Sequence, residues 1–115
     1  MTAQIDDELW SAVADPSRRQ VLDLLISNGE ASASWLAGRV PFSRQAVSKH
    51  LAVLERAGLI SRRKAGREVR YQVEAARLDQ ATRAMTELAA QWDRRLAALK
   101  QLAETAHAEN KRRRP

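Results

Sequence analysis

The chain has 115 residues, of which 20 are Lys or Arg and 14 are Asp or Glu; its net charge is +6 and it contains no cysteine. This length fits one compact domain, with or without an extended element, and leaves little room for a large catalytic domain. The absence of cysteine excludes disulfide frameworks, thiolate metal sites and thiol redox switches from this chain. No apolar run reaches the roughly 18–20 residues of a membrane span, and the polar, acidic residues 1–8 are unlike a signal peptide, so we expect a cytoplasmic protein.

The positive charge is concentrated in the middle of the chain. Residues 39–70 hold nine Lys or Arg and two Asp or Glu, a net +7, whereas residues 1–38 carry −4 and residues 71–115 carry +3. Clustering of one sign of charge over a short segment is typical of nucleic-acid sites. The alternative is a basic surface that only keeps the protein soluble.

The first third of the chain predicts two helices. The apolar spacing over residues 9–13 is that of a short amphipathic helix. Asp15 is a good N-cap and Pro16 fits the first position of a second helix. The apolar face of this helix lies within residues 21–26, and Asn-Gly at 28–29 predicts its end.

A helix-turn-helix is predicted over about residues 32–57. Ser32 can cap a third, short helix that Pro41 ends, and Ser43 can cap a fourth helix that closes at residues 57–58. Two short helices joined by a tight turn, the second with a basic outer face, are typical of this DNA-binding motif. The candidate DNA-contacting residues of the fourth helix are Ser43, Arg44, Gln45, Ser48, Lys49 and His50.

A basic β-hairpin, or wing, is predicted over about residues 59–73. Val69, Tyr71 and Val73 alternate with polar residues, which is a strand pattern, and Gly66 supplies the turn. The candidate DNA-contacting residues of the wing are Arg62, Arg63, Lys64 and Arg67. Four cations within six residues favour contact with phosphate, and Arg67 beside Gly66 is best placed to enter the minor groove. The alternative is that these charges only prevent strand addition at a sheet edge.

One long amphipathic helix is predicted over about residues 76–108, followed by a basic tail at 109–115. Its apolar positions recur every seven residues, and roughly 30 residues of helix span about 45 Å, more than a small winged helix can cover. A second copy of the chain is the simplest partner for the remainder, and an intramolecular core is the alternative. The candidate dimer surface is Leu9, Trp10, Val13, Met85, Leu88, Trp92, Leu96 and Leu99.

The predicted fold is therefore mainly α with a small β-hairpin, a winged helix-turn-helix of order α-α-α-α-β-β-α in one domain over residues 1–110. Over about residues 9–100 the sequence resembles the ArsR/SmtB family of bacterial winged-helix repressors. The matching segments are residues 14–19, 36–37, 43–51, 57–59 and 66–71. The resemblance implies a homodimer joined by its first and last helices, an operator in double-stranded DNA with two-fold symmetry, and repression by blocking the promoter.

The sequence departs from the metal-sensing members of the family. Where arsenic and cadmium sensors resemble one another in a Cys-x-Cys pair, residues 34–37 read Ser-Trp-Leu-Ala. At the zinc ligands of other members the nearest equivalents are Asp79, Ala81, Trp92 and Arg95, which do not form a zinc site. The chain is thus similar to the metal-independent branch, with the pattern Trp-Asp-Arg-Arg-Leu at 92–96. We expect no metal and no cofactor.

Several roles have two interpretations at this stage. Arg44 and Gln45 can read guanine and adenine by bidentate hydrogen bonds, or can simply be solvated. His50 fits a packing role as well as it fits a DNA contact. Trp35 can mark a ligand or partner contact, although packing is the simpler explanation. No enzyme constellation is present, because there are only two His and no Gly-rich phosphate loop. A nucleoid-associated protein of low specificity and a protein-interaction module are the functional alternatives.

Overall fold

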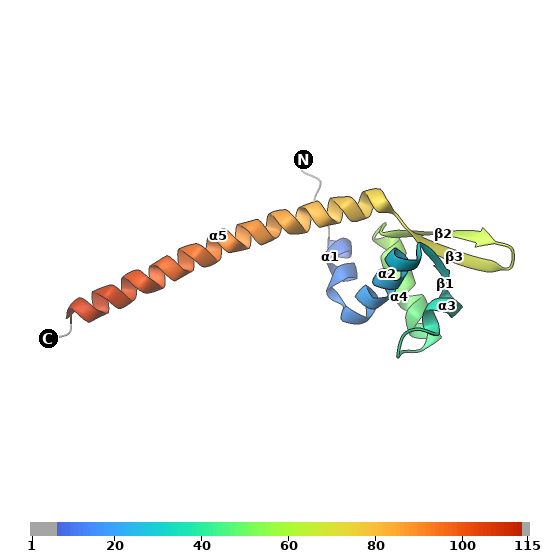
Figure 1. Cartoon of the computed structure of the whole chain (residues 1–115), viewed down its shortest axis with the longest axis horizontal. Helices are drawn as coiled ribbons and strands as arrows, with labels where there is room; N and C mark the ends of the chain where they lie inside the picture. The colour runs from blue at the N-terminus through green and yellow to red at the C-terminus, as the bar shows by residue number, and fades with distance from the viewer. Residues whose placement is uncertain (1–6, 114–115) are drawn as a thin grey trace. The chain divides into compact units, whose positions relative to one another are not determined.

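The computed structural model describes residues 7–113 and divides into two compact units, one up to Thr82 and one from Arg83 onward. The elements in chain order are α1 (Asp7–Ala14), α2 (Pro16–Asn28), β1 (Glu30–Ser32), α3 (Ala33–Ala37), α4 (Arg44–Arg56), β2 (Ile60–Ala65), β3 (Glu68–Val73) and α5 (Ala75–Arg113) (Figure 1). The predicted winged helix-turn-helix is confirmed, with β1 as an additional strand. Residues 1–6, which were included in the predicted domain, and residues 114–115 of the predicted tail lie outside the described residues.

Side chains cap the N-termini of α2, α3 and α4, as the sequence predicts. Asp15 accepts a hydrogen bond from the backbone N–H of Arg18 at 3.1 Å, with Pro16 in the first position of α2. The hydroxyl of Ser32 accepts from the Trp35 N–H at 3.1 Å, and that of Ser43 accepts from the Ala46 N–H at 3.1 Å. Each cap satisfies a backbone donor that the first turn of a helix leaves without a partner.

Helix α3 ends earlier than the position of Pro41 suggests. Its last residue is Ala37, and the N–H of Gly38 turns back to the carbonyl oxygen of Ser34 at 3.2 Å. Gly38 is a poor helix former, so the chain leaves the helix there, before proline would force it to do so. A longer turn, over residues 38–43, therefore connects α3 to α4.

The core of the first unit lies where α1, α2, α3 and α4 meet the base of the hairpin. Its large, fully buried side chains are Leu9, Val21, Leu25, Leu36, Val47, Leu51, Leu54, Leu59 and Ile60. No polar or charged residue is fully buried within residues 7–113. The apolar faces predicted for the second and fourth helices therefore both point inward, which fixes the polar face of α4 outward.

The wing, the hairpin of β2 and β3, is extended by β1 into a three-stranded antiparallel sheet with β3 in the middle, in the order β1-β3-β2. Ala31 lies opposite Tyr71 in the β1–β3 ladder, and Arg63 lies opposite Arg70 in the β2–β3 ladder. Gly66 turns the hairpin with a φ of 65°, a left-handed conformation that suits glycine. The strand β1 was not predicted, because three residues are too few to show an alternating pattern.

The second unit is helical throughout its described part, residues 83–113. The helix continues to Arg113, beyond the end predicted near residue 108, and its last turn holds Lys111, Arg112 and Arg113. Cations at a helix C-terminus interact favourably with the helix dipole, which stabilises this turn. At 1.5 Å per residue this part of α5 is about 46 Å long. Across the described residues, no helix has the length and apolarity needed to cross a membrane.

Candidate nucleic-acid interface

Helix α4 presents four of the predicted DNA-contacting residues together on its outer face. Arg44, Gln45, Ser48 and Lys49 are all exposed and line one open hollow. The opposite face of the same helix is held in the core by buried leucine and valine side chains. The anchored inner face thus fixes which side chains of α4 face solvent.

Ser43 and His50, at the two edges of this set, have structural contacts of their own. The hydroxyl of Ser43 is occupied as the cap of α4. The ring of His50 is half-buried and meets Phe42 edge to face, with centroids 5.4 Å apart at 82°. The structure thus shows a packing contact for His50, which is one of its two predicted roles.

The carboxyl group of Asp15, the cap of α2, has a lowered pKa. The hydrogen bond from the Arg18 backbone N–H lowers the pKa of Asp15, and the positive charge of Arg18 acts in the same direction, against a raising effect of desolvation. The side chain of Arg18 donates to the carbonyl oxygen of Ser11 at 2.7 Å, which links α1 to the start of α2.

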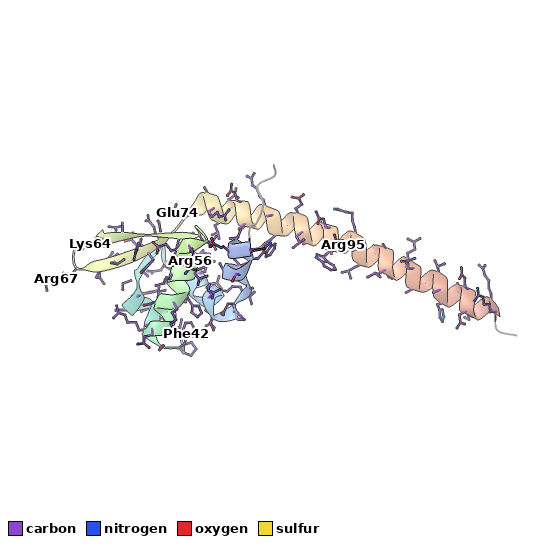
Figure 2. All side chains as sticks on the ribbon, turned by 180° about the vertical axis from the view of Figure 1, so that it is seen from behind. Phe42, Arg56, Lys64, Arg67, Glu74 and Arg95 are labelled. Atoms are coloured by element: carbon purple, nitrogen blue, oxygen red, sulfur yellow. The ribbon has the colours of Figure 1, made fainter. Side chains whose placement is uncertain are left out.

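Lys64 and Arg67 occupy the outer end of the wing. Both are exposed, and Figure 2 shows them at the far end of the hairpin from Arg56. Neither forms an ion pair with any residue between 7 and 113. Their charges are therefore available to a polyanion.

The other two predicted wing cations are paired with carboxylates. Arg62 Nε lies 3.2 Å from Glu55 Oε2. Arg63 donates two hydrogen bonds to Glu30, from Nε at 2.9 Å and from Nη2 at 2.6 Å. The four predicted wing cations therefore differ in their surroundings, because acidic residues of β1 and α4 form ion pairs with Arg62 and Arg63.

Glu30 also contacts a second arginine that was not among the predicted site residues. Arg70 Nη1 lies 3.4 Å from Glu30 Oε1, and Arg70 Nη2 lies 3.3 Å from Glu68 Oε1. The hydrogen bonds from Arg63 lower the pKa of Glu30, and the same contact raises that of Arg63. No sequence signal identified this cluster, because it depends on the unpredicted strand β1.

Trp35 packs within its own helix-turn-helix. Its ring is half-buried, and the Arg39 guanidinium carbon lies 3.7 Å from the ring centroid. Arg39 Nη1 also donates to the Trp35 carbonyl oxygen at 2.9 Å. Arg39 therefore covers one face of the Trp35 ring through a cation–π contact.

Known proteins match both the sequence and the fold. A family model described as a helix-turn-helix domain matches residues 13–63. The HTH-type transcriptional regulator Rv2034 of Mycobacterium tuberculosis is 37% identical over 88% of this chain and 91% of its own length. An ArsR-like transcriptional regulator from Rhodococcus has a solved structure with 44% identity and a TM-score of 0.64, covering 84% of this chain and 90% of that one. The chain belongs to the ArsR-like family of helix-turn-helix transcriptional regulators.

Two further relatives of this ArsR-like protein differ in the direction of regulation that their names give. The transcriptional repressor SdpR of Bacillus subtilis is 34% identical over 56% of this chain and 71% of its own length. The transcriptional activator HlyU of Vibrio cholerae is 38% identical over 70% of this chain and 69% of its own length. The family is one of DNA-binding regulators, so the prediction that the chain is not an enzyme is confirmed.

The predicted dimer surface of this ArsR-like chain divides into three groups. Leu9 is only 1% exposed, so it belongs to the core and has almost no area left for a second chain. The half-buried members are Trp10, Val13, Met85 and Leu88. Trp92, Leu96 and Leu99 are 49%, 56% and 59% exposed. Leu102, at 67%, extends the exposed stripe and was absent from the predicted set.

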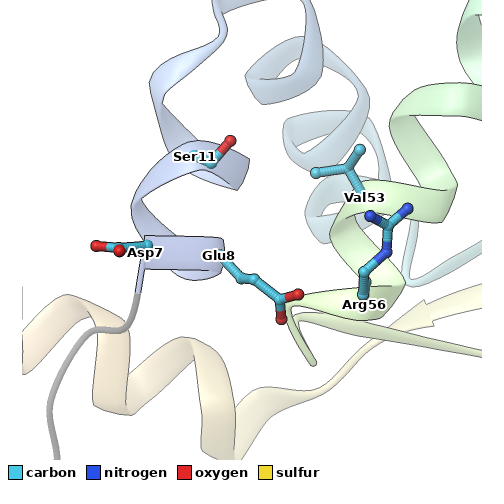
Figure 3. Close-up of a pocket in the computed structure, with 5 residues that line it drawn as sticks. All are labelled: Asp7, Glu8, Ser11, Val53 and Arg56. Carbon is cyan, nitrogen blue, oxygen red and sulfur yellow. The ribbon is translucent and has the colours of Figure 1, made fainter.

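A shallow pocket between α1 and α4 was not predicted. It is lined by Asp7, Glu8, Ser11, Val53 and Arg56 (Figure 3). Its acidic side chains come from α1 and its arginine from α4. No three His, Cys, Asp or Glu side chains gather as a possible metal site in the part of this ArsR-like chain that the structure describes.

Proposed function

We propose that this ArsR-like regulator is a dimeric, sequence-specific repressor of the bacterial cytoplasm that binds an inverted-repeat operator without a metal ion. The observation that carries the proposal is the solvent face of α4, where Arg44, Gln45, Ser48 and Lys49 lie together and exposed. Arginine can hold guanine and glutamine can hold adenine by paired hydrogen bonds in the major groove.

The wing complements this face. Lys64 and Arg67 form no ion pair with the described residues, and we assign them to phosphate contact, with Arg67 at the minor groove. Base contacts by α4 would provide the specificity and phosphate contacts by the wing would provide affinity.

Dimerisation is supported by the exposed apolar stripe of α5. Four large apolar side chains over residues 92–102 are about half exposed or more, which is costly for a chain that remains alone in water. A two-fold dimer would place two copies of α4 on DNA at half-sites whose centres are roughly 34–36 Å, or a multiple of this distance, apart. Blocking the promoter in this way would give repression, and the relative SdpR is named a transcriptional repressor.

Metal independence is supported by the composition of the chain and by the arrangement of its potential metal ligands. The chain contains no cysteine, and the described residues bring no group of three potential ligands together. We therefore expect operator affinity to stay constant when Zn²⁺, Cd²⁺ or arsenite is added. A shift beyond experimental error with any of these would contradict this part of the proposal.

A competition assay followed by footprinting tests the proposal. Operator fragments selected from genomic DNA should bind about 10³-fold or more tightly than random duplex, and the footprint should show two related half-sites. Arg44→Ala should cost about 1–3 kcal/mol at one base position, while Lys64→Ala should weaken binding to all sequences alike. A specificity ratio near one would instead indicate a nucleoid-associated protein, and a single asymmetric half-site would exclude the dimer.

A further inference from the structure

The carboxylate of Glu30 contacts two arginines of the wing, Arg63 and Arg70. Glu30 lies on β1, and its Oε1 is 2.6 Å from Arg63 Nη2 and 3.4 Å from Arg70 Nη1. Its second oxygen, Oε2, accepts a hydrogen bond from Arg63 Nε at 2.9 Å. The contact with Arg63 is therefore bidentate, the arrangement in which arginine binds a carboxylate or a phosphate most strongly.

The sheet register explains why a carboxylate is needed at this point. Arg63 and Arg70 lie directly opposite each other on β2 and β3. Like charges at directly opposed positions of an antiparallel ladder repel each other. Glu30 enters from the third strand, where its own backbone partner is Gln72, and bridges both guanidinium groups.

Lys64 and Arg67 differ from this pair in their surroundings. Both lie at or next to the turn of the hairpin, beyond the reach of β1, which is only three residues long. The wing thus holds two kinds of cation, namely arginines in ion pairs with carboxylates nearer its base and cations without an ion pair to the described residues at its tip. Net charge alone does not distinguish them.

We propose that Glu30 is an internal counter-ion that occupies the phosphate-binding groups of Arg63 and Arg70 and so limits the affinity of the wing for non-specific DNA. The proposal rests on the DNA-binding role of the wing proposed above. A cation adds to non-specific affinity by releasing counter-ions condensed on the phosphates. An arginine already paired with an acid of its own chain loses that partner when it binds phosphate, so it adds less. Glu30 then raises specificity indirectly. Because the wing binds random DNA less tightly, the contacts of α4 with the bases contribute more to the choice of binding site.

The main test measures the salt dependence of binding to a random duplex. Glu30→Gln keeps the shape of the side chain and removes its charge. It should steepen the plot of log affinity against log salt by about 0.9 for the release of Arg63, whereas Arg70 keeps its contact with Glu68. That corresponds to about a 3.5-fold larger loss of affinity per arginine between 50 and 200 mM salt. Exposed ion pairs contribute little to stability, so the variant should remain folded, which a thermal melt will verify.

Two controls separate this effect from net charge. Asp23→Asn removes the same charge from an exposed position on α2, and should leave the slope close to that of the wild type. Glu30→Asp keeps the charge on a shorter side chain and should stay closer to the wild type than Glu30→Gln does. Equal slopes for Glu30→Gln and Asp23→Asn would overturn the proposal.

A matched pair of arginine variants provides an independent test that leaves Glu30 intact. In the otherwise wild-type chain, Arg67→Gln should reduce the slope by about 0.9, whereas Arg63→Gln should change it little. In the Glu30→Gln background, Arg63→Gln should reduce the slope as well. Equal effects of Arg63→Gln and Arg67→Gln in the wild-type chain would refute the counter-ion role. If the wild type fails to prefer its operator over random duplex, the proposed specific function fails, whereas the slopes still decide the role of Glu30.

Discussion

Replacing Leu99 by Ala should weaken the proposed dimer by an amount that follows from its exposure. Leu99 is 59% exposed. Complete burial of a leucine side chain is worth about 2 kcal/mol, so burying the exposed part of Leu99 against a partner is worth about 1.2 kcal/mol. A two-fold dimer contains the residue twice, which gives about 2.4 kcal/mol, or roughly a 60-fold rise in the dimer dissociation constant.

Sedimentation velocity over a concentration series measures this dissociation constant directly. Alanine is the best helix former, so α5 should keep its helicity, as a circular dichroism spectrum will verify. Gln101→Ala is the matched control, because Gln101 is exposed and lies about 200° around the helix from Leu99. A dissociation constant for Leu99→Ala within about twofold of the wild type, or an equal shift for Gln101→Ala, would refute the reasoning.

Three further predictions concern the helix-turn-helix unit. Ser43→Ala removes the cap of α4 and should lower the free energy of unfolding by about 1 kcal/mol in a urea titration, whereas Ser48→Ala on the exposed face should change it by less than about 0.5 kcal/mol. Leu54→Ala opens the core beside α4 and should cost about 2–5 kcal/mol in the same assay, and a value below about 1 kcal/mol would show that the site collapses. Because the N–H of Arg18 lowers the pKa of Asp15, the charged cap stabilises the fold above its ordinary pKa of 3.8, and this contribution is lost as the pH falls through the lowered value. Asp15→Asn should abolish that pH dependence in urea titrations between about pH 2 and 6, so an unchanged difference from the wild type over this range would contradict the assignment.

The features that could be predicted from the sequence are those set by residues close together in the chain. Asp15, Ser32 and Ser43 each cap a helix three residues before the donor that they accept, so a short window of sequence contains the whole interaction. The outward face of α4 was also predicted, because its apolar residues recur at helical spacing and bury the opposite side. These local signals identified both the motif and its candidate interface.

The features that were missed depend on residues far apart in the chain. Glu30 meets Arg63 and Arg70 across separations of 33 and 40 residues, and only the pairing of β1 with β3 brings them together. Leu9 was assigned to a dimer surface for a related reason. An apolar residue on an amphipathic helix looks the same in the sequence whether it packs inside its own chain or against another one.

Ser32 has a consequence for how a signal could reach the wing. It is the last residue of β1, where it lies opposite Arg70, and it is also the cap of α3. The sheet and α3 therefore share a joint with no loop to absorb movement between them. Three residues of strand separate Arg70 from the tip at Arg67, about 10 Å, so tilting α3 by roughly 10° at this joint would move the tip by about 2 Å. A small tilt of α3 would therefore displace the tip of the hairpin, and with it Arg67, by a distance comparable to the length of a hydrogen bond to a phosphate.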